Sequence, residues 1–237
     1  MKPNGLKNKT RENHKIDGLS PDANKLRGHP KIINVETLIK NIDLAWETTR
    51  TPAEFRSKLL VIFRTTLSEG SNFIQDRFLS NNDGAEAVLA QAYLMDSLIK
   101  AALETIDTKL YRAPNPTQGE QLCIIAVGGY GRGELAPFSD IDLLFLLPYK
   151  QTPRIEQVVE TILYLLWDMK LKVGHSTRSI DECMRQAKAD MTVRTAILES
   201  RYICGEISLM EQMIARFREE IIKGSALEFV EAKLKES

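Results

Sequence analysis

Apolar residues recur every three or four positions through the first half of the chain, a spacing that places them on one face of an α-helix. Three such runs lie at 35–45, 55–63 and 88–103. Asn82 or Asp83 precedes the third run, and either side chain can cap a helix by accepting a hydrogen bond from its first turn. Pro and Gly are concentrated at 113–119, so we expect a helical N-terminal segment over residues 32–113.

The hydrophobic pattern changes after Gln121. Short apolar runs closed by Gly or Pro now have the length of buried strands. The predicted strands are Leu122–Val127, Ile141–Leu147 and Leu171–Arg178, and helices are predicted at 152–170, 180–189, 191–200 and 208–223. This order predicts a mixed α+β fold, in which a small sheet flanked by helices occupies residues 120–237.

Residues 1–31 form a basic leader without apolar periodicity, with eight Lys and Arg against three Asp and Glu. Such a segment has little apolar surface to offset the entropy of ordering, so we expect it to be disordered. The whole chain has 32 basic and 32 acidic residues, which gives no overall attraction to nucleic acid or to an anionic membrane. We therefore expect neither of these partners.

Cysteine usage and hydropathy predict a cytoplasmic protein. Cys123, Cys183 and Cys204 are widely spaced and form no C-x-x-C pair, so neither a disulfide framework nor a zinc site is indicated. No stretch approaches the roughly 18 to 20 apolar residues of a membrane span, and the basic start lacks the apolar core of a secretion signal.

Candidate chemistry is concentrated between Ala126 and Asp142. A predicted strand runs into Gly128 and Gly129, and an Asp-x-Asp pair begins eleven residues after the second glycine. Residues i and i+2 of a strand point to the same face, so Asp140 and Asp142 are expected to project side by side. Two carboxylates directed at one point repel each other unless a cation lies between them.

The aspartate pair therefore predicts a catalytic divalent-metal site. Hard oxygen ligands suit Mg²⁺ or Mn²⁺, and Mg²⁺ is usually held by one or two carboxylates together with substrate phosphates. Glycine lets backbone N–H groups approach a phosphate without a Cβ in the way, and arginine adds a charged fork. The predicted nucleotide and phosphate contacts are Gly128, Gly129, Gly131, Arg132 and Ser139. The residues support in-line attack by a hydroxyl on a metal-bound nucleoside triphosphate.

Each of these residues also has a plainer interpretation. Asp140 and Asp142 fit a solvated strand end with an Asx-type turn after Ser139, and the glycines fit a flexible turn. Arg132 and Glu134 fit a surface ion pair. The combination of glycines with paired aspartates favours the functional interpretation. A P-loop is excluded because no G-K-[ST] follows the glycines, and a Rossmann fingerprint fits poorly because a strand follows where that motif requires a helix.

The third predicted strand carries polar residues whose role the sequence leaves open. Lys172, Gly174, Ser176 and Arg178 alternate along it, so they either face a nucleotide or belong to an ordinary edge strand. His175 on the same strand is more typical of a structural, hydrogen-bonded histidine than of a catalytic base.

The glycine and aspartate spacing resembles the signature of the DNA polymerase beta-like nucleotidyltransferase superfamily. The string GGYGRGELAPFSDIDLLFL, together with LKVGHSTRSIDEC and AILESRYICG, resembles more specifically the bacterial PII uridylyltransferase and uridylyl-removing family. The resemblance covers about 88–237. It implies transfer of UMP from UTP to a tyrosine of the PII nitrogen-signalling protein, with release of pyrophosphate and dependence on Mg²⁺.

One feature of the superfamily is missing from its expected place. Many members use a third carboxylate on a neighbouring strand, and the predicted strand LKVGHSTR contains none. Glu199, expected on a helix, is a possible substitute as a metal ligand. Two alternatives to the implied reaction remain: a nucleotidyltransferase with another acceptor, and a catalytically weakened regulatory module that binds nucleotide.

The same family carries further domains after the nucleotidyltransferase domain, namely an HD phosphohydrolase domain and two ACT domains. This sequence ends at Ser237, and His14, His29 and His175 are each followed by a residue other than Asp. We therefore expect the chain to be a fragment that lacks the HD and ACT domains and retains uridylylation alone.

Overall fold

The computed structural model describes residues 31–113 and 117–223, and three long helices form its first part. They are α1 (Val35–Thr48), α2 (Pro52–Asn81) and α3 (Gly84–Thr105), which continues as a π-helical turn over Ile106–Leu110. The predicted helical runs are confirmed. Each helix begins after a residue whose side chain accepts a backbone N–H of the first turn, and these caps are Asn34, Thr51 and Asp83.

α2 is much longer than the apolar run at 55–63 predicted. Its second half buries only Gly70 and Ile74, so no regular apolar stripe marks it in the sequence. It is held by packing along α3 and ends at Asn82, whose left-handed backbone (φ 54°) stops the helix.

Four strands form one mixed sheet in the described part of the chain, in the order β3-β2-β1-β4. They are β1 (Cys123–Ala126), β2 (Ile141–Leu147), β3 (Val173–Ser179) and β4 (Arg201–Gly205). β1 is antiparallel to both β2 and β4, whereas β2 and β3 are parallel. The predicted α+β class is confirmed. Because β1 and β2 are antiparallel, the parallel β-α-β unit of a Rossmann domain is absent from this position.

Two local elements differ from the sequence prediction. The edge strand β4 was not predicted, because it is short and its pairing with β1 is irregular between Ile124 and Ile125. The expected glycine-rich turn contains a one-turn helix, α4 (Gly128–Gly131). Glu199 was predicted to lie on a helix. It instead follows the last residue of α7 (Met191–Leu198) and forms the C-cap of that helix.

The remaining predicted helices are confirmed with small changes at their ends. They are α5 (Pro153–Asp168), α6 (Ile180–Ala189), α7 and α8 (Ile207–Phe217), and a π-helical turn over Arg218–Lys223 extends α8. The capping box of α6, in which Ser179 and Glu182 each bond the other's backbone N–H, places its start directly after β3.

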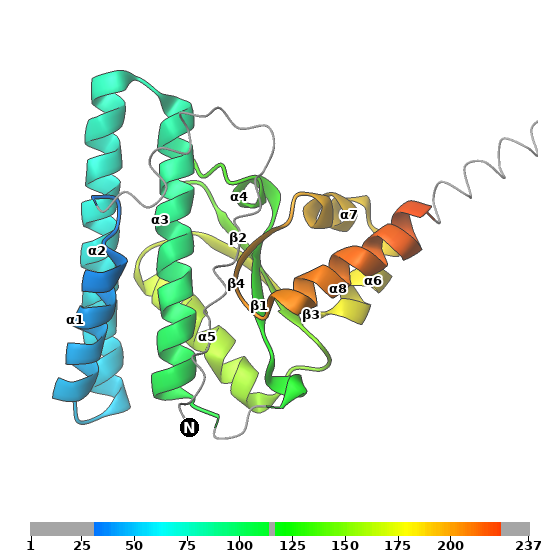
Figure 1. Ribbon diagram of the computed structural model, residues 1–237, viewed down its shortest axis with the longest axis horizontal. Helices are drawn as coiled ribbons and strands as arrows, with labels where there is room; N and C mark the ends of the chain where they lie inside the picture. Colours follow the sequence, from blue (N-terminus) through cyan, green and yellow to red (C-terminus); the bar gives the residue numbers. More distant parts are fainter. Residues whose placement is uncertain (1–30, 114–116, 224–237) are drawn as a thin grey trace, which may run out of the picture.

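The sheet separates two hydrophobic clusters because strand side chains alternate between its faces. On β2, Ile141, Leu143 and Phe145 join the larger cluster with α3 and α5, whereas Leu144 and Leu146 join the smaller one with α6 and α8. Figure 1 shows α1 to α3 on one side of the sheet and α6 to α8 on the other, with the sheet between them.

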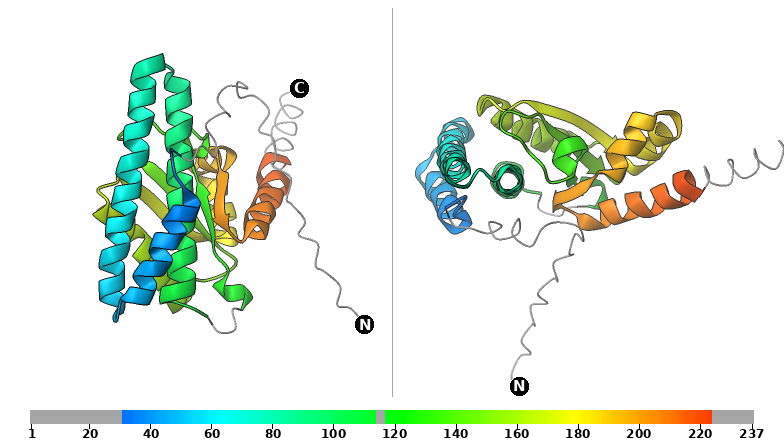
Figure 2. Two further views of the ribbon diagram at one scale, coloured as in Figure 1. Left: turned by 60° about the vertical axis from the view of Figure 1, so that its left-hand side comes forward. Right: turned by 90° about the horizontal axis from the view of Figure 1, so that it is seen from above.

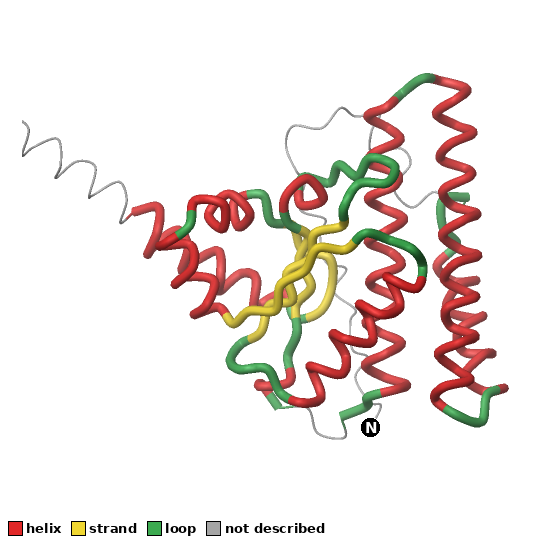
Figure 3. Tube along the Cα trace, turned by 180° about the vertical axis from the view of Figure 1, so that it is seen from behind, coloured by secondary structure: helices red, strands yellow, loops and turns green. Residues whose placement is uncertain are grey.

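The helical N-terminal segment and the sheet share a continuous core, since the larger cluster contains residues of α1, α2 and α3 as well as of the strands. Seen from above, α1 and α2 form the outer layer and α3 lies between them and the sheet (Figure 2). The view from behind shows the twisted strands against α5 and α3 (Figure 3). α3 is therefore the helix through which the first part of the chain meets the sheet.

Two sequence predictions fall partly outside this description. The basic leader expected over 1–31 lies, except for Lys31, outside the described residues. Within the parts that are described, we find no helix that combines the length and the apolar character needed to cross a membrane.

Gly70→Ala provides a test of the packing between α2, α3 and the chain before α1. Alanine is favoured over glycine in a helix by about 1 kcal/mol. A Cβ at Gly70, however, would overlap with the carbonyl oxygen of Ile32 and lie 2.8 Å from Leu94 Cδ2. We expect the clash to dominate, with a net loss of about 1–3 kcal/mol in the free energy of unfolding.

The matched control is Gly84→Ala, because a Cβ there meets nothing within 4 Å. Chemical denaturation of both variants should show a loss for the first and a change within about 0.5 kcal/mol for the second. Equal stability of Gly70→Ala and the parent chain would show that this helix contact is looser than described.

Candidate functional site

The carboxylate of Asp142 occupies a space that two glycines leave open. Asp142 lies on β2 in register with Gly174 of the neighbouring β3. A Cβ on Gly174 would overlap with Asp142 Oδ1, and a Cβ on Gly128 would lie 3.3 Å from Asp142 Oδ2. Glycine at both positions therefore allows this carboxylate to lie between the glycine loop and β3.

Asp140 and Asp142 are close enough to interact electrostatically, as their spacing predicted. Partial burial raises the pKa of Asp142, and the negative charge of Asp140 raises it further. Asp140 itself is exposed and precedes the first residue of β2. The two carboxylates thus form a pair whose charges oppose each other, the electrostatic situation that a divalent cation relieves.

The glycine loop begins where β1 ends and turns sharply into α4. Gly128 has a left-handed backbone (φ 60°), which favours glycine, and lies directly beside Asp142. The Val127 N–H donates to the Asp142 carbonyl oxygen at 3.1 Å, so the start of the loop is tied to β2. Gly128 is therefore adjacent to Asp142, and its predicted contact with phosphate stays a prediction.

The other glycines of the loop occupy different surroundings. Gly129 is open, because a Cβ there would meet only Arg132 Nη2 at 3.7 Å. Gly131 is buried, and a Cβ there would overlap with the carbonyl oxygen of Glu199. Close packing is sufficient reason for glycine at Gly131, so its predicted contact with phosphate stays a prediction, as does that of Gly129.

Arg132 is held at the surface of the loop by two glutamates. Its Nη1 donates to Glu199 Oε1 at 2.9 Å, and its Nε lies 3.5 Å from Glu134 Oε2. The hydrogen bond and charge of Glu199 raise the pKa of Arg132, with a smaller contribution from Glu134. The ion pair with Glu134 was one of the sequence interpretations, and half of the arginine side chain remains exposed to solvent.

A third carboxylate is not brought to the aspartate pair. Glu199 binds Arg132 instead, and across 31–113 and 117–223 no three His, Cys, Asp or Glu residues are grouped in a way that could hold a metal ion. A metal ion at this site would therefore take its protein ligands from Asp140 and Asp142.

The strand β3 places its polar residues on two faces. Ser176 and Arg178 follow Gly174 on the face that carries Asp142, because residues two apart along a strand share a face. His175 points to the other face, where its ring meets Trp167 of α5 edge-on with centroids 5.8 Å apart. The histidine is thus separated from the aspartates by the sheet. Sequence reasoning underestimated Gly174, whose signal was only a glycine inside a strand.

The loop between α4 and β2 ends in an exposed, strained turn beside the aspartates. Phe138 has a left-handed backbone (φ 66°) and is 94% exposed. The next residue, Ser139, donates its N–H to the Ala136 carbonyl oxygen at 3.1 Å. Ser139 is therefore exposed next to Asp140, and its predicted contact with phosphate stays a prediction.

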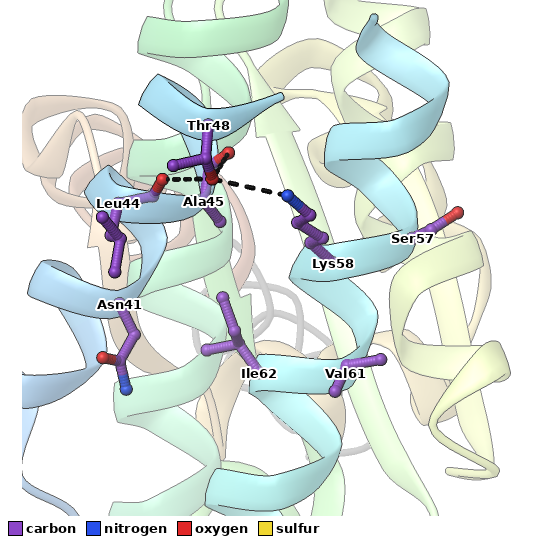
Figure 4. A pocket seen from close by; sticks show the side chains of 8 residues that line it. All are labelled: Asn41, Leu44, Ala45, Thr48, Ser57, Lys58, Val61 and Ile62. Atoms are coloured by element: carbon purple, nitrogen blue, oxygen red, sulfur yellow. Dashed lines mark hydrogen bonds between the residues drawn. The ribbon is translucent and has the colours of Figure 1, made fainter. Parts of the chain in front are cut away.

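One pocket lies away from these residues. Between α1 and α2 there is a pocket of about 470 Å³, lined by residues of these two helices alone: Asn41, Leu44, Ala45, Thr48, Ser57, Lys58, Val61 and Ile62. Figure 4 shows Lys58 extended toward Thr48, to whose hydroxyl it donates. None of the lining side chains is an acid, a thiol or an imidazole, and the ammonium group of Lys58, the one ionisable group among them, is bound to the Thr48 hydroxyl.

A family model for the nucleotidyltransferase domain matches residues 118–203, which include the glycine loop, both aspartates, the strands β1 to β3 and the first part of β4. The chain contains a nucleotidyltransferase domain. The match ends within β4, so it includes three strands of the sheet completely and the fourth in part. Both this match and the relatives described next support a role in nucleotidyl transfer.

Three curated relatives are each named as a bifunctional uridylyltransferase/uridylyl-removing enzyme. The chain is 48% identical over 205 residues to the one from Azospirillum brasilense, which covers 86% of this chain and 22% of the relative. It is 46% identical to that of Rhodopseudomonas palustris, over 81% of this chain and 21% of the relative. It is 50% identical to that of Rhodospirillum rubrum, over 77% of this chain and 20% of the relative.

These comparisons confirm the resemblance that the glycine and aspartate strings indicated. The identity extends over most of the chain and so includes more than the domain model itself. The chain spans about a fifth of the length of the curated relatives it matches.

Gly174→Ala tests whether the space beside Asp142 matters. The added methyl group would overlap with Asp142 Oδ1, so the carboxylate must rotate away from its position between the two glycines. A displacement of this kind at a catalytic group costs about 10²-fold in turnover. We expect such a loss in nucleotidyl transfer, measured as initial rates with radiolabelled UTP.

The matched control is Gly119→Ala, whose Cβ would lie in ordinary contact, 3.7 Å from Thr117 Oγ1 and outside the strands. Its rates should equal those of the parent chain. Full activity in Gly174→Ala would show that the position of the Asp142 carboxylate described here is not required.

Asp142→Asn tests the electrostatic strain in the pair. A carboxylate whose pKa is raised in the folded state makes folding less favourable at pH values where the group is ionised. Below the ordinary pKa of 3.8 the group is protonated in both the folded and the unfolded state, so this cost is absent. In the absence of divalent cations the asparagine variant should therefore be more stable at pH 7. The gain should be under about 1 kcal/mol, because solvent screens a partly exposed group.

The measurement is urea denaturation of both proteins between pH 3 and 7 in the presence of EDTA, a range that brackets the ordinary aspartate pKa of 3.8. The stability difference should shrink as the pH falls and the parent carboxylate takes up its proton. A difference of opposite sign at pH 7 would contradict the assigned repulsion.

Proposed function

We propose that this domain transfers UMP from UTP to a tyrosine hydroxyl of the PII nitrogen-signalling protein and releases pyrophosphate. The observation that carries the proposal is the arrangement at Asp142, whose carboxylate lies between the glycine loop and β3 with Asp140 beside it. Nucleotidyl transfer requires a triphosphate and its metal to meet at one point, and here the phosphate-compatible loop and the carboxylate pair are adjacent.

The residues present fit a divalent metal ion. Asp140 and Asp142 provide hard oxygen ligands, and the pKa of Asp142 is raised by burial and, in addition, by the negative charge of Asp140. We propose Mg²⁺ or Mn²⁺ as the ion; when bound, such an ion neutralises charge that develops on the phosphates. With two carboxylates as ligands, the remaining positions are left for water and phosphate oxygens.

The protein's own groups then position the reactants. The open backbone at Gly128 and Gly129 would bind the triphosphate, and Arg132 would add charge once a phosphate competes with Glu199 for its guanidinium group. The tyrosine oxygen forms a bond to the α-phosphorus, the bond from that phosphorus to the β-phosphate oxygen breaks, and the hydroxyl proton passes to solvent. Catalysis rests on orientation and charge neutralisation.

The names of the relatives support UTP as donor, since each is called a uridylyltransferase. The same similarity is our reason for proposing a PII-type protein as acceptor and the cytoplasm as location. The shared region supports the transfer half of the relatives' activity, because the matched domain model is that of a nucleotidyltransferase.

A second function is favoured by one observation. Within the described residues no third carboxylate joins Asp140 and Asp142, which leaves the attacking hydroxyl without an obvious base. A domain of this kind that binds UTP without turnover would act as a regulatory module. Isothermal titration with Mg²⁺ and UTP, compared with a turnover assay, separates the two functions.

The decisive experiment is transfer of radiolabel from UTP to purified PII protein, with ATP and CTP as competing donors. Asp140→Asn combined with Asp142→Asn should abolish labelling, since removal of both charges removes the metal ligands. The fold should be retained, because a pair at a solvent-facing strand end contributes little to packing. Retained labelling by the folded double variant would exclude the metal site. Labelling of a different acceptor in place of PII would show that the proposed acceptor is wrong.

A further inference from the structure

Tyr130 in the middle of α4 is fixed by a partly buried aspartate of α3. The side chain is 1% exposed and its hydroxyl donates to Asp96 Oδ1 at 2.6 Å. Burial, the negative charge of Asp96 and the hydrogen bond to it all raise the pKa of Tyr130. The residue between the open glycine Gly129 and the packed glycine Gly131 is therefore attached to a helix of the N-terminal segment.

Arg201, the first residue of β4, binds the same aspartate and the same tyrosine. Its Nη1 donates to Asp96 Oδ2 at 2.5 Å and its Nη2 to Asp96 Oδ1 at 3.1 Å, a bidentate pair. Nη2 also donates to the Tyr130 carbonyl oxygen at 3.1 Å, and the guanidinium lies 5.3 Å from the centre of the tyrosine ring. Tyr130 is thus held through its hydroxyl, its ring and its carbonyl group.

The ion pair is mostly buried, with 13% of the Arg201 side chain and 21% of the Asp96 side chain exposed. Burial alone would lower the pKa of Arg201, but the charge of Asp96, the hydrogen bonds to it and the contribution of Tyr130 together raise it above the ordinary value. Removal of one member of such a pair leaves an uncompensated charge, which is strongly destabilising. Lysine cannot replace the arginine fully, because it lacks the planar fork that serves two acceptors.

A second attachment fixes the far end of the same loop. The Leu135 N–H donates to the carbonyl oxygen of Val88, also on α3, at 3.2 Å. Asp96 and Val88 therefore hold the loop at two points along one helix. The N-terminal segment thereby acts on the geometry of the glycine loop, although none of its residues lies in the site itself.

We propose that Asp96 and Arg201 are positioning residues for nucleotide binding, which act through Tyr130 to hold the glycine loop in place beside Asp142. This inference rests on the proposed function only for the identity of the ligand, because the contacts that hold the loop are made within the protein itself.

The chain offers a matched control in Arg154 of α5. That side chain pairs with Asp107 and donates its Nε to the Tyr111 carbonyl oxygen at 2.7 Å, on elements remote from the glycine loop.

The test compares Arg201→Lys and the milder Tyr130→Phe with Arg154→Lys in the full chain. Three quantities are measured for each: the free energy of unfolding, amide hydrogen exchange across 127–135 by mass spectrometry, and the Kd for UTP in the presence of Mg²⁺ by titration calorimetry. Exchange and binding are recorded under conditions where every variant is folded.

We expect Arg201→Lys to speed exchange in the loop and to raise the Kd for UTP by about tenfold or more, since small displacements at a site are costly. Tyr130→Phe loses only the hydroxyl and should show a smaller change in the same direction. Arg154→Lys should lose stability without faster exchange in the loop or a weaker Kd. Unchanged exchange in Arg201→Lys and Tyr130→Phe would overturn the inference, as would faster exchange with an unchanged Kd.

The same measurements distinguish failure of the proposed function from failure of the inference about the loop. If the parent chain binds no UTP, the proposed function fails, while the exchange data still decide whether Asp96 and Arg201 hold the loop. If Arg201→Lys does not fold, Tyr130→Phe provides the decision, because removal of one hydroxyl leaves the ion pair intact.

Discussion

The close approach of the Asp142 carboxylate to backbone is the constraint on which the arrangement of this domain depends. A carboxylate next to a strand and a loop needs room, and Gly174 and Gly128 provide it by having no Cβ. Their positions are set by the parallel pairing of β2 with β3 and by the sharp turn after β1. The same backbone that supplies hydrogen bonds for the sheet thus also determines where a pair of like charges is held.

That arrangement disfavours the ionised form of Asp142, because burial and the charge of Asp140 both raise its pKa. A site that binds a cation is expected to show such strain, since charges arranged for a ligand repel one another without it. The surrounding packing must then hold the strand ends in place. Here that role falls to two apolar clusters on opposite faces of the sheet, which fix β2 through alternate side chains.

Much of the fold can be predicted from sequence patterns that lie within a single helix or strand. Apolar periodicity and capping residues located the helices, and the run IDLLFLL located β2 because its residues are buried on both faces. β4 was missed because five residues with an irregular pairing carry no clear period, and the strand is recognisable only beside β1. The length of α2 was missed for a related reason: α3 stabilises it, and its own sequence shows no continuous apolar stripe there.

The same distinction between local patterns and contacts between distant elements applies to the candidate site. The Asp-x-Asp spacing determines that Asp140 and Asp142 lie close together, because this depends only on neighbouring residues at the start of one strand. Whether a glutamate 57 residues later joins them depends on where α7 ends, and there Glu199 binds Arg132 instead. The roles of Gly174 and Arg201 likewise arise from contacts between elements distant in sequence. Local sequence therefore specifies the chemistry offered at this site, while the tertiary packing of β3, β4 and α3 decides how firmly the groups are held.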